Sequence, residues 1–168
     1  MELVHRLGAW MLVASGIAKS LGEGEALCRE AVKTGKARDL FLSNVSRQGG
    51  NPDKLLALRG AYRSPWKTEL LAPTGGYIDS IDAWKIGLAG VQLGVGRNTT
   101  GDSVYPDVGF IFEHKKGDRV AKGDRVAMIY GKDEASLSSS LDLAAEALRI
   151  SPEAPAPTKL VLEELSAT

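Results

Sequence analysis

Apolar positions recur at helical spacing through the first 60 residues. In residues 2–17 they cover most of the circumference of a helix, as expected for a helix enclosed by a larger structure. Residues 23–36 and 36–50 show the narrower stripes of amphipathic helices, with glycines as their expected stops. The predicted inward side chains are Leu3, Leu7, Trp10, Ala14, Ile17, Leu27, Ala31, Val32, Leu40, Phe41 and Val45. Three short helices cannot hide this much apolar surface, so we expect a helical layer of a larger structure.

The pattern changes at residue 66. Residues 66–73 and 75–82 alternate apolar and polar side chains, as half-buried strands do. Residues 83–94 return to helical spacing and end at a glycine. The predicted inward side chains of this helix are Trp84, Leu88 and Val91.

A short internal echo follows the next predicted strand, residues 107–115. Gly117-Asp118 and Gly123-Asp124 stand six residues apart and predict two tight turns around a very short strand. The chain then continues with strand 125–131 and with a helix over 133–150. The inward face of that helix is predicted from Leu137, Leu141, Ala144 and Leu148.

The last 18 residues combine a proline-rich linker, 151–157, with a predicted closing strand, 158–165. The expected fold class is therefore α+β. We expect a helical segment in residues 1–65 and a domain of mixed β-sheet with helices in residues 66–168.

Composition removes several classes of function. Lys and Arg total 21 and so do Asp and Glu, so no net charge draws the chain to nucleic acid or to an anionic membrane. A hydrophobic fraction of 43% predicts a folded protein. The lone cysteine, Cys28, excludes an internal disulfide and fits a reducing compartment, and with His5 and His114 it makes no zinc ligand set.

The N-terminus combines Arg6 with an apolar run of signal-peptide length. The acidic Glu2, the interrupting Gly8 and Gly16, and the lack of a small-x-small cleavage site favour a buried helix instead. The run is too short to cross a membrane, which takes about 20 apolar residues. We expect a cytoplasmic protein.

Residues 93–104, LGVGRNTTGDSV, raise the question of a phosphate-binding glycine loop. A dinucleotide-binding loop lies between a strand and the helix after it, so that the helix N-terminus faces the phosphates. Here Gly94 ends a helix and a strand comes next, which contradicts that topology. A weaker possibility stays open, namely contact with an anion supplied by another domain through Arg97, Asn98, Thr99 and Thr100.

No other constellation predicts catalysis. Ser64 and Ser103 have no histidine near them in the sequence, and Glu113 fits a solvated strand end. Asp82 is best interpreted as the N-cap of helix 83–94, three residues after Asp79. Cys28 fits a core position better than a nucleophile. We therefore assign no catalytic, cofactor-binding or metal-binding residue.

Residues 115–136 carry an alternative hypothesis. They are similar to half of a biotinyl or lipoyl carrier domain, in which a G-D-x-V-x-x-G turn leads to a strand and a hairpin lysine. Lys132 would then be the modified residue. A carrier needs a matching second half after that lysine, whereas a helix is predicted there.

Residues 75–130 resemble the C-terminal domain of the pyrimidine-nucleoside and thymidine phosphorylases. The motifs in order are Asp82 with Ile86-Gly87, Gly94-x-Gly96-Arg97, Val108-Gly109 and Gly117-Asp118-x-Val120-x-x-Gly123. Residues 2–52 are similar to the segment that precedes this domain in the same enzymes, and residues 159–165 to their last strand. Val95 and Tyr105 depart from the family pattern and bring the local turn geometry into question.

The resemblance implies an α/β-hammerhead, barrel-sandwich-like fold and the phosphorolysis of thymidine or uridine to free base and pentose 1-phosphate. The family's phosphate- and base-binding residues precede the region that this chain matches, so none is transferred and we expect the chain alone to be inactive. The expected partners are the missing N-terminal catalytic portion or a homodimer mate, with nucleoside and phosphate as substrates, no other cofactor, no nucleic acid and no membrane. A truncated product, half of a split enzyme, a carrier module and a non-catalytic binding domain all remain open.

Overall fold

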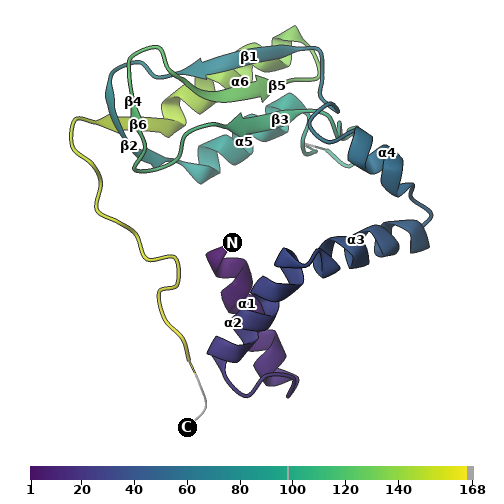
Figure 1. The fold of residues 1–168 in the computed structure, drawn as a ribbon. Helices are drawn as coiled ribbons and strands as arrows, with labels where there is room; N and C mark the ends of the chain where they lie inside the picture. Colours follow the sequence, from purple (N-terminus) through teal and green to yellow (C-terminus); the bar gives the residue numbers. More distant parts are fainter. Residues whose placement is uncertain (98, 166–168) are drawn as a thin grey trace. The chain divides into compact units, whose positions relative to one another are not determined.

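The computed structural model describes residues 1–97 and 99–165, and the chain divides into two compact units (Figure 1). Unit 1 comprises residues 1–59 together with the C-terminal residues from 158 onward. Unit 2 comprises residues 60–157. The described residues contain six helices and six strands, so the predicted α+β class with its helices first is confirmed.

Unit 1 is helical, as predicted. Its helices are α1 (Glu2–Ala14), α2 (Leu21–Lys33), α3 (Lys36–Arg47) and α4 (Pro52–Ala57). Ser20 caps α2 by accepting a hydrogen bond from the backbone N–H of Glu23, and Asn51 caps α4 in the same way with Lys54. We did not predict α4, although Asn51 followed by Pro52 is a typical helix start.

Helices α1 and α2 contact each other through small residues. Gly24 is buried, and a Cβ atom placed on it would come within 2.8 Å of the Ala9 Cα. A Cβ on Gly8 would come within 2.7 Å of the Cys28 sulfur. The two backbones therefore approach closely at this point, and large side chains do not separate them.

This close packing leaves most of the large apolar side chains of unit 1 exposed, which corrects our prediction of their burial, although Trp10 and Val45 are half-buried. Leu7 is 57% exposed, Leu40 73% and Phe41 57%. Leu3, Ile17, Leu27 and Val32 are also exposed. The small residues Ala9, Ala18 and Gly24 are the buried ones. The helices are present where the apolar stripes predicted them, but α1 and α2 contact each other through small residues and not through these stripes.

The closing strand predicted over 158–165 is not formed in the described part of the chain. Residues 159–165 are irregular and make no backbone hydrogen bond there. They belong to unit 1, where Arg6 donates hydrogen bonds to Glu164 and to Glu25. A strand requires a neighbouring strand to take up its backbone groups, and the described helices of unit 1 offer none.

Unit 2 contains two three-stranded sheets. The first has the order β1-β5-β3, and the second has the order β4-β2-β6. The strands are β1 (Lys67–Leu71), β2 (Gly76–Ile81), β3 (Gly109–Phe112), β4 (Arg119–Val120), β5 (Arg125–Tyr130) and β6 (Leu148–Ser151). Every recorded pairing is antiparallel, so the expected mixed sheet is wrong, and the sheets do not close into a barrel over the described residues.

Strand β6 was missed because its sequence continues the helical pattern. Leu148 follows Ala144 at helical spacing, but helix α6 (Glu134–Ala147) stops one residue earlier. Residues 148–151 then pair with β2, with Ile150 opposite Ile78. The pairing supplies backbone partners that the isolated sequence does not reveal, and this tertiary contact overrides the local preference.

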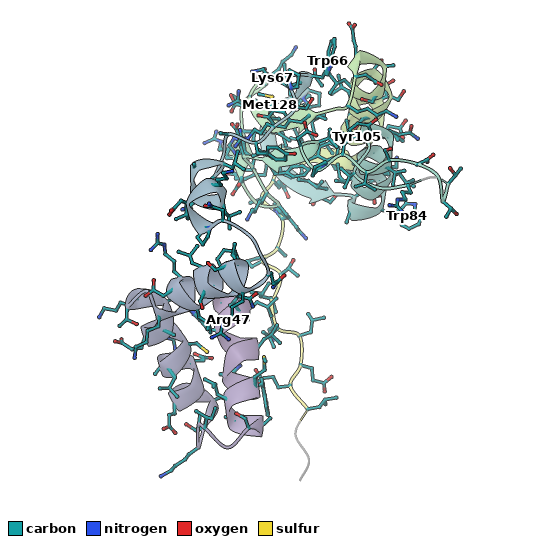
Figure 2. The ribbon with its side chains drawn as sticks, turned by 90° about the vertical axis from the view of Figure 1, so that its right-hand side faces the viewer. Arg47, Trp66, Lys67, Trp84, Tyr105 and Met128 are labelled. Atoms are coloured by element: carbon teal, nitrogen blue, oxygen red, sulfur yellow. The ribbon has the colours of Figure 1, made fainter. Side chains whose placement is uncertain are left out.

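The core of unit 2 lies between the sheets and helices α5 (Ala83–Leu93) and α6, which pack on each other. Its fully buried large side chains include Ile78, Leu93, Val126 and Ile129. Helix α5 turns Ala89, Gly90 and Leu93 inward. Our expectation that Trp84 and Leu88 face inward is wrong, because they are 76% and 42% exposed, and Trp84 projects away from α5 (Figure 2).

Both predicted Gly-Asp turns are present. Gly117 and Gly123 adopt φ values of +92° and +87°, which favour glycine. In each turn the aspartate side chain accepts a hydrogen bond from the backbone N–H three residues earlier, that of Lys115 for Asp118 and that of Ala121 for Asp124. The two turns flank β4 and hold it at the edge of the second sheet.

The glycines of α2 allow a direct test of the α1–α2 contact. Gly24→Ala should destabilise unit 1 by roughly 1–3 kcal/mol, because the added methyl group collides with the Ala9 backbone. Gly22→Ala is the matched control, because no heavy atom lies within 4 Å of its added Cβ and alanine favours the helix. Thermal unfolding followed by circular dichroism measures both. Equal melting curves for the two variants would contradict the close packing.

Candidate functional site

The base of the 93–105 loop is held at the C-terminal end of α5. Gly94 ends the helix with φ +103°, and its carbonyl accepts a hydrogen bond from the Tyr105 N–H at 2.9 Å. The Leu93 carbonyl accepts one from the Lys132 N–H at 3.2 Å. The loop thus leaves and re-enters the fold at one point, where the strand–helix junction at Lys132 meets the end of α5.

Tyr105 and Lys132 also converge on Gly94 with their side chains. A Cβ atom at Gly94 would lie 2.9 Å from the Tyr105 Cδ2 and 3.5 Å from the Lys132 Cδ. Beside this contact lies a surface pocket of about 580 Å³, whose lining includes Thr99, Asp102, Tyr105 and Lys132. Lys132 is 38 positions from Gly94 in the sequence, so their proximity could not be predicted from spacing.

The polar run of the loop forms a local turn. The Thr99 N–H and hydroxyl donate to the Asp102 carboxylate at 2.9 and 2.8 Å, and the Asp102 N–H donates to the Thr99 carbonyl at 3.1 Å. Arg97 and Thr100 are exposed and do not line the pocket, and Asn98 lies outside the described residues. The four-residue anion contact that we considered is therefore not assembled by the described part of the loop.

The electrostatics of this loop also disfavour a phosphate cradle. The loop follows the C-terminal end of α5, where the helix dipole places partial negative charge, whereas anions bind at helix N-termini. The pocket combines one ammonium group, Lys132, with one carboxylate, Asp102. This pair suits a polar ligand without strong net charge better than a phosphate.

The two serines that we considered are not placed for nucleophilic attack. The Ser64 hydroxyl is buried and donates to the Gly131 carbonyl at 2.6 Å, while accepting from the Trp66 N–H. It anchors the segment that leads into β1. Ser103 is exposed on the loop, and neither hydroxyl has a recorded histidine partner in the part of the chain that the structure describes.

The acidic candidates have structural roles. The Asp82 side chain accepts hydrogen bonds from the Trp84 and Lys85 backbone N–H groups, which confirms it as the N-cap of α5. Glu113 is more than a solvated strand end, because it pairs with Arg125 at 2.7 Å. Glu69 on β1 and Glu113 both accept from Arg125, and Glu69 is the larger cause of the raised pKa of this guanidinium.

The cysteine and histidines are dispersed. Cys28 is half-buried against Gly8 in unit 1, as a packing role predicts. His114 lies 3.9 Å from Asp118 in unit 2, whereas His5 belongs to α1. Over residues 1–97 and 99–165 no group of three potential His, Cys, Asp or Glu ligands comes together. None of the helices described there is both long enough and apolar enough to span a membrane.

Lys132 lies between strand β5 and helix α6, with a backbone that is fixed on both sides. Asp133 caps α6 in a reciprocal capping box with Ser136. The Ser136 N–H donates to the Asp133 carboxylate and holds the pKa of that group below its usual value. The hairpin tip that the carrier hypothesis requires is therefore replaced by a strand–helix junction.

The sequence comparisons agree with this architecture. Residues 77–151, from β2 to the end of β6, match the pyrimidine nucleoside phosphorylase C-terminal domain. Unit 2 thus contains the C-terminal domain of a nucleoside phosphorylase, which confirms the resemblance predicted from the motifs.

Curated relatives extend the match into unit 1. The chain is 36% identical over 129 residues to a pyrimidine-nucleoside phosphorylase of Staphylococcus epidermidis, covering 77% of this chain and 30% of the relative. It is 31% identical to a thymidine phosphorylase of Rhizobium meliloti, covering 99% of this chain and 38% of the relative. A pyrimidine-nucleoside phosphorylase of Bacillus subtilis is 31% identical, with coverage of 93% and 36%. The chain is homologous to the C-terminal portion of this phosphorylase family and spans about a third of the length of these relatives.

Amide hydrogen exchange should distinguish the 95–103 loop from the sheet. The backbone N–H groups of Gly101 and Ser103 donate no hydrogen bond to the described residues, so we expect fast exchange there. Residues 126–129 lie in the central strand of the first sheet and should exchange far more slowly. Mass-spectrometric exchange at peptide resolution measures both segments, and equal protection would contradict this view of the loop.

The cap of α5 supplies a second test. Asp82→Ala should lower the free energy of unfolding of unit 2 by about 1 kcal/mol, because the first turn of α5 loses its side-chain acceptor. Asp79→Ala is the matched control, because the Asp79 side chain on β2 makes no hydrogen bond to the described chain, and its effect should stay within about 0.5 kcal/mol. Chemical denaturation followed by Trp fluorescence provides the measurement. A cap that contributes nothing would leave the two variants indistinguishable.

Proposed function

We propose that this chain acts as the non-catalytic C-terminal portion of a pyrimidine-nucleoside phosphorylase. In the reaction implied by the family, phosphate attacks the anomeric carbon of a pyrimidine nucleoside, the glycosidic bond breaks, and free base and pentose 1-phosphate are released. The observation that carries the proposal is the match of residues 77–151 to the family's C-terminal domain, with relatives that align over up to 99% of the chain.

The chemistry of the described residues supports a non-catalytic role. Phosphorolysis requires groups that hold a phosphate dianion and groups that bind the pyrimidine base. The pocket beside the loop combines Lys132 with Asp102, and the carboxylate opposes a dianion. We infer that the reacting groups are supplied by the region of the relatives that this chain does not span. The lone cysteine fits action in a reducing compartment, which we take to be the cytoplasm.

The carrier hypothesis is the weaker alternative. Lys132 is exposed and chemically available, but it is followed by the capped helix α6, where a carrier domain would continue with the strands of its second half. The intact mass of the natively expressed protein separates the two functions, because a biotinyl or lipoyl group adds a fixed increment. An unmodified mass favours the phosphorylase role.

The proposed function predicts activity only in the presence of the portion of the relatives that this chain does not span. The purified chain, incubated with uridine or thymidine and phosphate, should release no base above a mock preparation. Adding the portion of the Bacillus subtilis relative that precedes its match to this chain should produce turnover, and that portion alone should remain inactive. The full-length relative is the positive control. Turnover by this chain alone, or no gain on mixing, would count against the proposal.

A further inference from the structure

Strand β1 has a free edge. It pairs with β5 on one side, and no strand of the described chain lies beyond it in the first sheet (Figure 1). The Trp66 carbonyl faces β5, because it accepts a hydrogen bond from the Gly131 N–H at 3.0 Å. Residues of an antiparallel strand alternate in the side toward which their backbone groups face. The N–H and C=O groups of Lys67 and Glu69 therefore face away from β5, and such an open edge is a template for a further strand.

The charges along this edge are open to a further partner. Lys67 and Glu69 are two residues apart, so they project to the same face of β1, and both are exposed. The Lys67 ammonium group makes no ion pair within the described chain. The Glu69 Oε1 accepts a hydrogen bond from Arg125 at 2.9 Å, while its Oε2 accepts none from the described residues. The edge thus presents one cation and one anion, each with room for an opposite charge.

This charge pattern is complementary to an antiparallel copy of itself. When the two Thr68 residues lie opposite each other, Lys67 lies opposite Glu69 of the second copy, and Glu69 lies opposite Lys67 of the second copy. Both are positions whose backbone groups face outward, so each pair also exchanges backbone hydrogen bonds. The neighbouring registers place Lys67 opposite Lys67, or Glu69 opposite Glu69, and like charges that face each other across strands are destabilising. The edge therefore favours one register of self-pairing.

A groove beside the edge offers a place for an aromatic side chain. The groove has a volume of about 480 Å³ and lies between β1 and α6, with Thr68, Leu137 and Leu141 in its lining. Trp66 also lines it next to α6 and is 47% exposed (Figure 2). In the register centred on Thr68, Trp66 of the second copy lies opposite Leu70, on the same side of the sheet as the groove. Each copy would then cover its indole with the groove of the other, which adds apolar burial to the backbone pairing.

We propose that β1 is a self-association edge, at which a second copy of this chain adds its own β1 antiparallel to form one continuous sheet. Lys67 and Glu69 determine the register, and Trp66 is the apolar anchor. The surface belongs to unit 2, so the inference does not rest on the proposed function. The pairing is short, because Pro65 has no N–H to donate and the register shifts between Leu70 and Leu71. A dimer of this kind is weak and depends on concentration.

Two charge variants of the full chain test the register. In Lys67→Glu and in Glu69→Lys, each paired position meets a like charge, so the dimer dissociation constant should rise by about tenfold in each. In an equimolar mixture of the two variants every pair is again opposite in charge, and the mixture should associate about as tightly as the native chain. Sedimentation equilibrium over a range of concentrations measures all four samples. A mixture that associates no better than its separate components overturns the proposal.

Lys115→Glu is the matched control for the change of net charge. Lys115 is exposed and follows β3, the strand at the opposite edge of the same sheet. Its reversal should leave the dimer dissociation constant unchanged. Association that none of the three variants alters identifies another surface, such as the exposed apolar side chains of unit 1, and rejects the β1 edge. A native chain that stays monomeric at the highest concentrations reached also rejects it.

Cross-linking by cysteine tests the position of the two-fold axis. The variants are made in a Cys28→Ala background, since Cys28 is the only native cysteine. Opposed residues at a position like that of Thr68 have Cα atoms about 4.5 Å apart, within the range of a disulfide. Thr68→Cys should therefore form a covalent dimer under mild oxidation. Lys67→Cys should not, because its copies lie diagonally, about 7–8 Å apart. Cross-linking at position 67 in preference to 68, or at neither, contradicts the proposed register.

Discussion

The backbone pairing made by the two Gly-Asp turns is the constraint on which unit 2 depends. The Gly117 N–H donates to the Ile78 carbonyl at 2.8 Å, and the Ile78 N–H donates to the Asp118 carbonyl at 2.9 Å. The second turn repeats this pattern. The Gly123 N–H donates to the Ala72 carbonyl at 2.9 Å, and the Ala72 N–H donates to the Asp124 carbonyl at 2.8 Å. Ile78 and Ala72 are both buried. Each turn therefore supplies hydrogen-bond partners to both the N–H and the C=O of one buried residue.

These turns also determine where β5 runs, and β5 in turn positions the loop. Because the second turn ends at Asp124, β5 starts at Arg125 in the middle of the first sheet and ends at Tyr130. Lys132 follows two residues later and donates its backbone N–H to Leu93 at the end of α5. Strand β5 thus connects the second turn directly to Lys132 at the pocket beside Gly94. The pocket is held by backbone hydrogen bonds at its base, while its rim consists of polar loop residues.

The sequence predicted the features that depend on local chemistry. The two Gly-Asp turns, the Asp82 cap and the Gly94 stop follow from backbone preferences of single residues, and all are present. Features that depend on distant contacts escaped prediction. Strand β6 exists because β2 accepts it, and Trp84 faces outward because the smaller Ala89 and Gly90 allow α5 to approach its neighbours closely. At the candidate site, the sequence predicted the topology of the loop but not the approach of Lys132 to Gly94.

The contrast between the two units explains why an isolated sequence of this kind contains so much exposed apolar surface. Unit 2 buries Ile78, Leu93, Val126 and Ile129 among its own elements. In unit 1, by contrast, the buried apolar side chains belong to Ala9 and Ala18 over the described residues, while Leu40 and Met11 are each 73% exposed. Burial of one Leu or Met side chain contributes roughly 1.5–3 kcal/mol, so a surface that covers several of them would stabilise unit 1 by an amount comparable to the whole stability of a small domain. We propose that the exposed apolar residues of α1 to α4 form one side of an interface, with these helices as its supporting layer.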